Sequence, residues 1–161
     1  MSSKESILLV DDEPYVLVSM KRSLEEDGHV VLTAPGAAEG LRLLEENEVA
    51  LVISDWKMPA MDGVAFLQKV AVRSPDTLTI ILTANAQLEG SIEAINRAGV
   101  FKFILKPWKP ADLRQTVMRT LAYRKAYLQR DAVKREVKRI STLCESVETS
   151  SRRPAVPESY G

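Results

Sequence analysis

Five short apolar runs, each followed by a segment of helical periodicity, most limit how this chain can fold. Runs such as Ile7-Leu8-Leu9-Val10 are almost wholly apolar, which is typical of strands covered on both faces. The segments between them place apolar residues three or four positions apart, as amphipathic helices do. This alternation predicts one parallel sheet with helices on both faces. The expected strands are 7–10, 29–33, 50–54, 78–82 and 100–105, and the expected helices are 14–27, 36–47, 64–72, 86–97 and one that begins near Pro110.

Polar residues stand where four of these strands end. Asp11 and Asp12 follow the first strand, Asp55 the third, Thr83 the fourth and Lys106 the fifth. The carboxyl ends of strands in a doubly wound sheet line the crevice in which ligands bind. We therefore expect these five side chains to converge.

The chemistry of this set points to a cation and a phosphoryl group. Three clustered carboxylates repel one another unless a cation joins them, and their oxygens suit Mg²⁺. A carboxylate nucleophile beside a metal ion and a lysine is an arrangement for phosphoryl transfer. The alternative interpretation is that these acids only cap the helices that follow and face water. Capping explains one such acid easily, but it explains the whole set of five residues poorly.

The motifs that contain these residues resemble the receiver domain of bacterial two-component response regulators. The resemblance spans residues 4–122 and implies a flavodoxin-like (βα)5 domain that a sensor histidine kinase or phosphotransfer protein phosphorylates. It also implies that phosphorylation changes the surface around helix 86–97 and strand 100–105, and so controls an output domain or protein by contact. The motifs are Leu9-Val10-Asp11-Asp12-Glu13, Asp55-Trp56-Lys57-Met58-Pro59-Ala60-Met61-Asp62-Gly63, Thr83-Ala84 and Lys106-Pro107.

The resemblance implies a role for each acidic residue. Asp55 is the expected phospho-acceptor and also part of the Mg²⁺ site. Asp12 is the expected direct ligand, and Asp11 acts mostly through a metal-bound water. The backbone carbonyl of Lys57 is the third protein ligand.

Other matched residues are expected to act in switching. Lys106 pairs with the acceptor carboxylate and then with the phosphoryl group, on which the Thr83 hydroxyl closes. Phe103 matches the switch aromatic, and a plain core position is its alternative. Lys57 and Asn85, each two residues after a site residue, are expected to tune hydrolysis of the acyl phosphate.

Two backbone features are expected to support the site. Gly63 is expected to give the loop before helix 64–72 a permissive backbone. The Lys106-Pro107 bond is expected to be cis and to aim the lysine into the crevice, because X–Pro is where cis bonds occur.

A metal-dependent phosphohydrolase that uses Asp55 is the alternative of a different class. Such enzymes usually need a second acid two residues after the nucleophile, where this chain has Lys57, and a cap domain, for which the sequence has no insertion. We therefore expect no enzymatic activity other than Mg²⁺-dependent self-phosphorylation and self-dephosphorylation.

The charges change sign along the chain. Residues 1–110 hold 11 Lys and Arg against 16 Asp and Glu, and residues 111–161 hold 11 against 6. This change of sign predicts an acidic domain followed by a basic extension. No helix-turn-helix pattern follows the extension in the sequence, so direct binding of nucleic acid is not expected. The apolar runs are too short for a membrane span or a secretory signal, so a cytoplasmic protein is expected.

A long helix is expected from Pro110 to about residue 148, because no Gly or Pro interrupts it. Residues 123–149 form the basic extension, and residues 150–161 have the composition of a disordered tail or linker. Heptad spacing favours a coiled coil and a parallel homodimer through residues 123–148, with a solvated or back-folded helix as the alternative. The seam positions are Ala126, Val133, Ile140 and Val147 with Tyr123, Arg130, Val137 and Cys144, of which Arg130 and Cys144 are poor seam residues.

Overall fold

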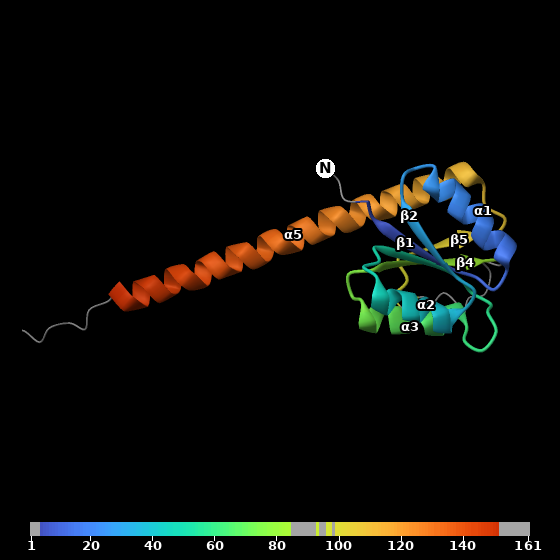
Figure 1. Cartoon of the computed structure of the whole chain (residues 1–161). Helices are drawn as coiled ribbons and strands as arrows, with labels where there is room; N and C mark the ends of the chain where they lie inside the picture. The colour runs from blue at the N-terminus through green and yellow to red at the C-terminus, as the bar shows by residue number, and fades with distance from the viewer. Residues whose placement is uncertain (1–3, 85–92, 94–95, 98, 152–161) are drawn as a thin grey trace, which may run out of the picture. The chain divides into compact units, whose positions relative to one another are not determined.

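The computed structural model describes residues 4–84, 93, 96–97 and 99–151 (Figure 1). Its strands form one parallel sheet in the order β2-β1-β3-β4-β5. The strands are β1 (Ser6–Val10), β2 (Val30–Ala34), β3 (Leu51–Asp55), β4 (Leu78–Thr83) and β5 (Lys102–Leu105). The helices are α1 (Pro14–Glu25), α2 (Ala37–Glu46), α3 (Gly63–Arg73) and α5 (Pro110–Ser151).

The predicted doubly wound α/β fold with an extended C-terminal helix is confirmed. Observed strand ends differ from the expected ones by at most two residues, the largest difference being β5, which begins at Lys102. Asn85 and most of the expected helix 86–97 lie outside the described residues.

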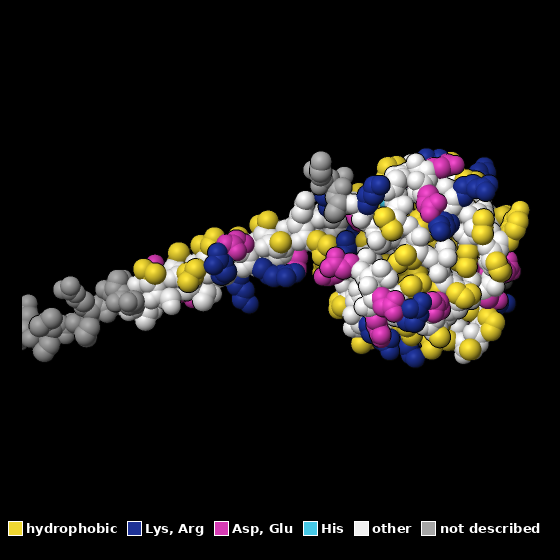
Figure 2. Space-filling view, in the orientation of Figure 1, with side chains coloured by type: hydrophobic (Ala, Val, Ile, Leu, Met, Phe, Trp, Pro, Cys, Tyr) yellow, Lys and Arg dark blue, Asp and Glu magenta, His cyan; other side chains and the backbone are white. Residues whose placement is uncertain are grey.

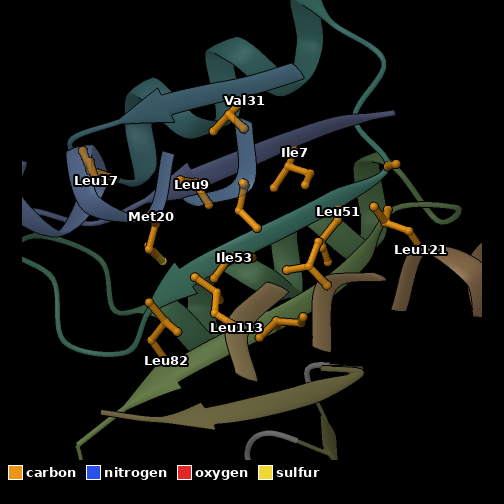
Figure 3. Packing of buried hydrophobic residues seen from close by; sticks show 14 residues of the cluster. Ile7, Leu9, Leu17, Met20, Val31, Leu51, Ile53, Leu82, Leu113 and Leu121 are labelled. Atoms are coloured by element: carbon orange, nitrogen blue, oxygen red, sulfur yellow. The ribbon is translucent and has the colours of Figure 1, made fainter. Parts of the chain in front are cut away.

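The sheet separates two apolar cores because side chains alternate between its faces. Leu8 and Val10 of β1 pack in a cluster with α2 and α3, whereas Ile7 and Leu9 pack in a second cluster with α1 and the first turns of α5. Figure 3 shows this second cluster, in which Leu113 and Leu121 of α5 lie over the sheet. Each fully buried aliphatic side chain contributes about 1.5–3 kcal/mol to stability. The two layers therefore hold the strand ends, and the residues that follow them, in fixed positions.

The chain divides into two compact units, residues 1–124 and 125–161, and the single helix α5 contributes to both. In the first unit Leu113, Val117 and Leu121 are buried. In the second unit large apolar side chains such as Val133 and Ile140 are exposed. Among the helices in the described ranges, none combines the length and apolar character needed to cross a bilayer.

Candidate functional site

Three carboxylates meet at the carboxyl edge of the sheet. Asp11 and Asp12 directly follow β1, and Asp55 ends the neighbouring strand β3. One oxygen from each of the three lies within 4.8 Å of the other two. Asp11 is fully buried and Asp55 is buried, whereas Asp12 is exposed. The expected convergence of the acids is therefore present in the structure.

Lys106 supplies the positive charge at this cluster. Its Nζ lies 3.0 Å from Oδ1 of Asp55 and 3.6 Å from Oδ2 of Asp11. The backbone N–H of Lys106 donates to the carbonyl oxygen of Thr83 at 2.8 Å, which ties the end of β5 to the end of β4. The Lys106-Pro107 bond is cis, as predicted.

Burial makes the charge of Asp11 costly. Burial raises the pKa of Asp11 to about 6, and the negative charges of Asp55 and Asp12 act in the same direction. Two groups lower this pKa: the Glu13 N–H, which donates to Asp11 Oδ1 at 2.9 Å, and the positive charge of Lys106. The other oxygen, Oδ2, is buried and has no hydrogen-bond partner. A buried acceptor of this kind costs free energy unless a donor or a cation meets it.

Burial alone would lower the pKa of Lys106. The hydrogen bond to Asp55 and the charges of Asp11 and Asp55 outweigh burial, so the pKa of Lys106 is raised. Lys106 therefore stays protonated at neutral pH and offsets part of the negative charge of the cluster.

Asp12, Asp55 and Lys106 of this cluster line a pocket of about 480 Å³. Thr83, the last residue of β4, is buried and forms part of its wall. Glu13 and Trp56 also line the pocket. The sequence assigned neither a role in the site, although both stand within the quoted motifs, directly after a site residue. The full lining is Asp12, Glu13, Asp55, Trp56, Lys57, Thr83, Ala84 and Lys106.

The loop between β3 and α3 corrects the expectation for Gly63. The left-handed residue of this loop is Ala60, with φ 69°, and not Gly63. Gly63 is needed for space, because a Cβ there would lie 2.1 Å from the carbonyl oxygen of Asp55. Its N–H donates to the Trp56 carbonyl at 2.7 Å, and Asp62 caps α3 by accepting from the Ala65 N–H at 2.7 Å. The start of α3 thus packs directly against the backbone of the site.

Phe103 is not a core residue. It lies on β5 opposite Ile81 of β4, and 48% of its surface is exposed. The core alternative for Phe103 is wrong because β5 is an edge strand with a mostly exposed burial pattern, rather than a strand covered on both faces.

The donor set fits a hard divalent cation. Carboxylate oxygens in close proximity, one of them buried and without a hydrogen-bond partner, are the ligands that Mg²⁺ prefers. Lys57, whose backbone carbonyl was expected to ligate, lines the same pocket. Carboxylates, a lysine and a hydroxyl around one pocket can together bind and transfer a phosphoryl group.

Residues 7–118 match the response regulator receiver domain, and the chain belongs to this family. It is 37% identical over 118 residues to the hydrogenase transcriptional regulatory protein HoxA of Cupriavidus necator, a match that covers 73% of this chain and 24% of that protein. It is 31% identical over 135 residues to the C4-dicarboxylate transport transcriptional regulatory protein DctD of Rhizobium meliloti, covering 84% of this chain and 29% of that protein. The structure of a CheY-like response regulator receiver domain protein of Methanospirillum hungatei is similar, with a TM-score of 0.74 at 34% identity, covering 78% of this chain and 99% of that one.

The chain therefore contains the receiver domain of a response regulator, a domain through which phosphorylation controls an output. Receivers act with a kinase partner and a downstream output, and they typically bind Mg²⁺ at acidic residues such as those clustered here. The chain spans 24% to 29% of the length of the two curated relatives named above.

Proposed function

We propose that Asp55 is the phospho-acceptor of this receiver. The supporting observation is the position of the Lys106 amine, 3.0 Å from Oδ1 of Asp55, at a pocket that Thr83 also lines. Asp55 is the acid of the cluster that combines this lysine contact with a place in the pocket wall, whereas Asp11 is fully buried. A donor phosphoryl group that enters the pocket can therefore meet the Asp55 carboxylate beside a positive charge.

In the transfer step an oxygen of Asp55 attacks phosphorus. The new bond joins that oxygen to the phosphoryl group, the bond from phosphorus to the donor breaks, and its electron pair leaves with the donor. Lys106 then exchanges its bond to the carboxylate for one to a phosphoryl oxygen. The phosphoryl group carries about −1.5 to −2 charges and three acceptor oxygens. Asp55 gives up its own carboxylate charge in forming the bond, so the cluster with Asp11 and Asp12 becomes more negative by less than that amount.

Mg²⁺ is the proposed cofactor of this step. Asp11, Asp12, Asp55 and the backbone carbonyl of Lys57 would hold it, with Asp12 as the direct ligand and Asp11 acting mostly through water. Bound there, the ion supplies positive charge that neutralises phosphoryl oxygens. Oδ2 of Asp11 supports this assignment, because it is buried and has no hydrogen-bond partner, with the Lys106 amine 3.6 Å away.

Switching is proposed to begin at Thr83. Its hydroxyl would close on a phosphoryl oxygen, and Phe103 on the neighbouring strand would respond by changing its exposure, together with the surface around residues 86–97 and 100–105. The phosphoryl group must bind one packing better than the other for this to occur. Lys57 and Asn85 would tune the lifetime of the acyl phosphate, and replacing Lys57 with Ala should change its decay rate.

The proposed partners are a sensor histidine kinase or a phosphotransfer protein, and an output domain or protein that reads the switched surface. A homodimer through residues 123–148 would join two copies by the apolar seam of α5. The proposed setting is the cytoplasm, with self-phosphorylation and self-dephosphorylation as the only reactions.

The acceptor assignment is tested with Asp55→Asn, an acyl phosphate donor and Mg²⁺. Wild-type protein should gain one phosphoryl group by intact mass, and the variant should gain none. Asp76→Asn is the matched control, because Asp76 is an exposed aspartate away from the pocket and should label normally. Stoichiometric labelling of Asp55→Asn would exclude Asp55 as the acceptor.

A further inference from the structure

Charge is segregated along the second unit. Lys125–Arg139 contains six basic residues against Asp131 and Glu136, whereas residues 140–149 contain Glu145 and Glu148 and no Lys or Arg. Figure 2 shows the Lys and Arg side chains gathered on one part of this helix and hydrophobic side chains along it. The segment is therefore basic in its first part and acidic in its second. The six basic residues are Lys125, Arg130, Lys134, Arg135, Lys138 and Arg139.

An apolar seam runs through both parts. Val133, Val137, Ile140 and Val147 are 50% to 65% exposed, and they follow one another at intervals of four, three and seven residues. Such a stripe needs a partner helix to leave water. The charge pattern indicates which partner fits, because two copies of this segment are complementary to each other in one orientation only.

In a parallel, in-register pair each residue at a seam position meets its own counterpart, and Arg130 is the basic residue among them. Arg130 would face Arg130 at a seam position, with the Lys134 side chains beside them. Like charges at such a distance repel, and removing them from water adds to the cost.

In an antiparallel pair the basic half of each copy meets the acidic half of the other. With Val137 opposite Ile140 at the centre, Val133 comes opposite Cys144. Arg130 then comes opposite Val147 and next to Glu148, so that its long apolar stem covers the seam while its charge faces an acid. This register also brings residue 126 opposite residue 151, so the pair uses the whole helical part of the second unit.

We propose that the second copy binds α5 antiparallel in this register, opposite to the parallel arrangement that the heptad spacing alone favours. The proposal rests on the homodimer of the proposed function and adds its orientation. Charges at the positions that flank a coiled-coil seam set the orientation of the partner.

The single cysteine tests the orientation. Cys144 is exposed. Two cysteines form a disulfide only when their Cα atoms approach within about 7 Å. A parallel dimer juxtaposes Cys144 with itself, whereas the antiparallel dimer separates the two Cys144 residues by about 16 Å along the axis. Mild oxidation of the full chain should therefore yield no Cys144–Cys144 dimer if the proposal holds.

A mixed experiment supplies the positive result. A tagged Val133→Cys/Cys144→Ser variant is equilibrated with the unmodified chain and then oxidised. The antiparallel register predicts a tagged–untagged disulfide and no disulfide between identical chains. Disulfides between identical chains alone would show a parallel dimer and overturn the proposal.

Charge reversal gives an independent readout by sedimentation. Arg130→Glu and Glu148→Lys should each weaken the dimer severalfold, and the double variant should restore it, because only the antiparallel register places the two residues together. Added salt should also weaken the wild-type dimer, since it screens attraction. A monomer at every concentration would overturn the dimer itself, while normal phosphoryl labelling of Asp55 in the same preparation would leave the acceptor assignment intact.

Discussion

The backbone of Gly63, at the start of α3, packs against the backbone of Asp55, at the end of β3. A Cβ at position 63 would lie 2.1 Å from the Asp55 carbonyl oxygen and 3.0 Å from its carbonyl carbon. The obstacle is main chain at the end of the central strands, which cannot rotate away as a flexible side chain would. Residue 63 therefore determines how closely α3 approaches the acceptor position.

Gly63→Ala should destabilise the receiver by about 1–3 kcal/mol, because the methyl group overpacks against backbone. It should also slow phosphoryl labelling, since Asp55 must shift. Chemical denaturation and intact mass measure the two effects. Gly36→Ala is the matched control, because a Cβ at Gly36 meets nothing within 4 Å and its φ is extended. Equal stability of the two variants would contradict the packing argument.

Asp11→Asn should stabilise the metal-free protein at neutral pH. The folded Asp11 carboxyl holds its proton to about pH 6, and the unfolded one loses it near pH 4. The folded state therefore binds more protons between these values, and the stability of the wild type falls as pH rises through that window, by about 2–3 kcal/mol. The variant lacks this slope, whereas Asp76→Asn should keep it. Denaturation at pH 4, 5, 6 and 7 with a chelator present gives the measurement.

Added Mg²⁺ should make the wild type more stable than Asp11→Asn, the reverse of their order without metal. A ligand that binds only the folded state raises stability in proportion to the logarithm of its concentration above the dissociation constant. Thermal unfolding with increasing Mg²⁺ should raise the midpoint of the wild type and raise that of Asp11→Asn much less. Identical shifts in the two proteins would show that Asp11 takes no part in holding the ion.

Lys106→Met should bind Mg²⁺ more tightly and accept phosphoryl groups more slowly. The lysine amine lies 3.0 Å and 3.6 Å from two acids of the cluster, so its positive charge competes with the ion and later helps the transfer. Fluorescence of Trp56, which lines the pocket, reports binding. Lys109→Met is the control, because Lys109 is exposed and outside the pocket lining. Weaker Mg²⁺ binding in Lys106→Met would contradict this account of the charges.

Ala60→Gly should raise stability by about 1 kcal/mol, because φ of 69° is costly for a residue with a Cβ. Ala71→Gly, inside α3, should lower it by a similar amount, because glycine is a poor helix residue. Denaturant midpoints of the two variants should move in opposite directions. A loss of stability in Ala60→Gly would show that the methyl group makes a contact worth more than the backbone strain.

The sequence predicted the fold well because strand runs and helical spacing both record which faces are buried. Asp11, Asp12, Asp55 and Lys106 could be placed together from topology alone, since parallel strands bring their carboxyl ends to one edge. The structure supplied their distances and the burial of Asp11, neither of which residue order contains.

Three features could not be read in this way. The exposure of Phe103 depends on β5 being an edge strand, and an apolar run does not distinguish an edge from the interior of a sheet. The role of Gly63 depends on a contact with Asp55 across the loop rather than on its own backbone angle. The left-handed residue, Ala60, has no side chain that would signal it, because alanine is ordinary in helices, loops and strands.

The most direct test of the central claim identifies the residue that carries the phosphoryl group. The protein is treated with an acyl phosphate donor and Mg²⁺, reduced with borohydride, which converts an aspartyl phosphate to homoserine, and digested for peptide mass analysis. The account predicts homoserine at position 55 and none when Mg²⁺ is chelated. Homoserine at position 11 or 12 instead, or labelling that persists without Mg²⁺, would contradict it.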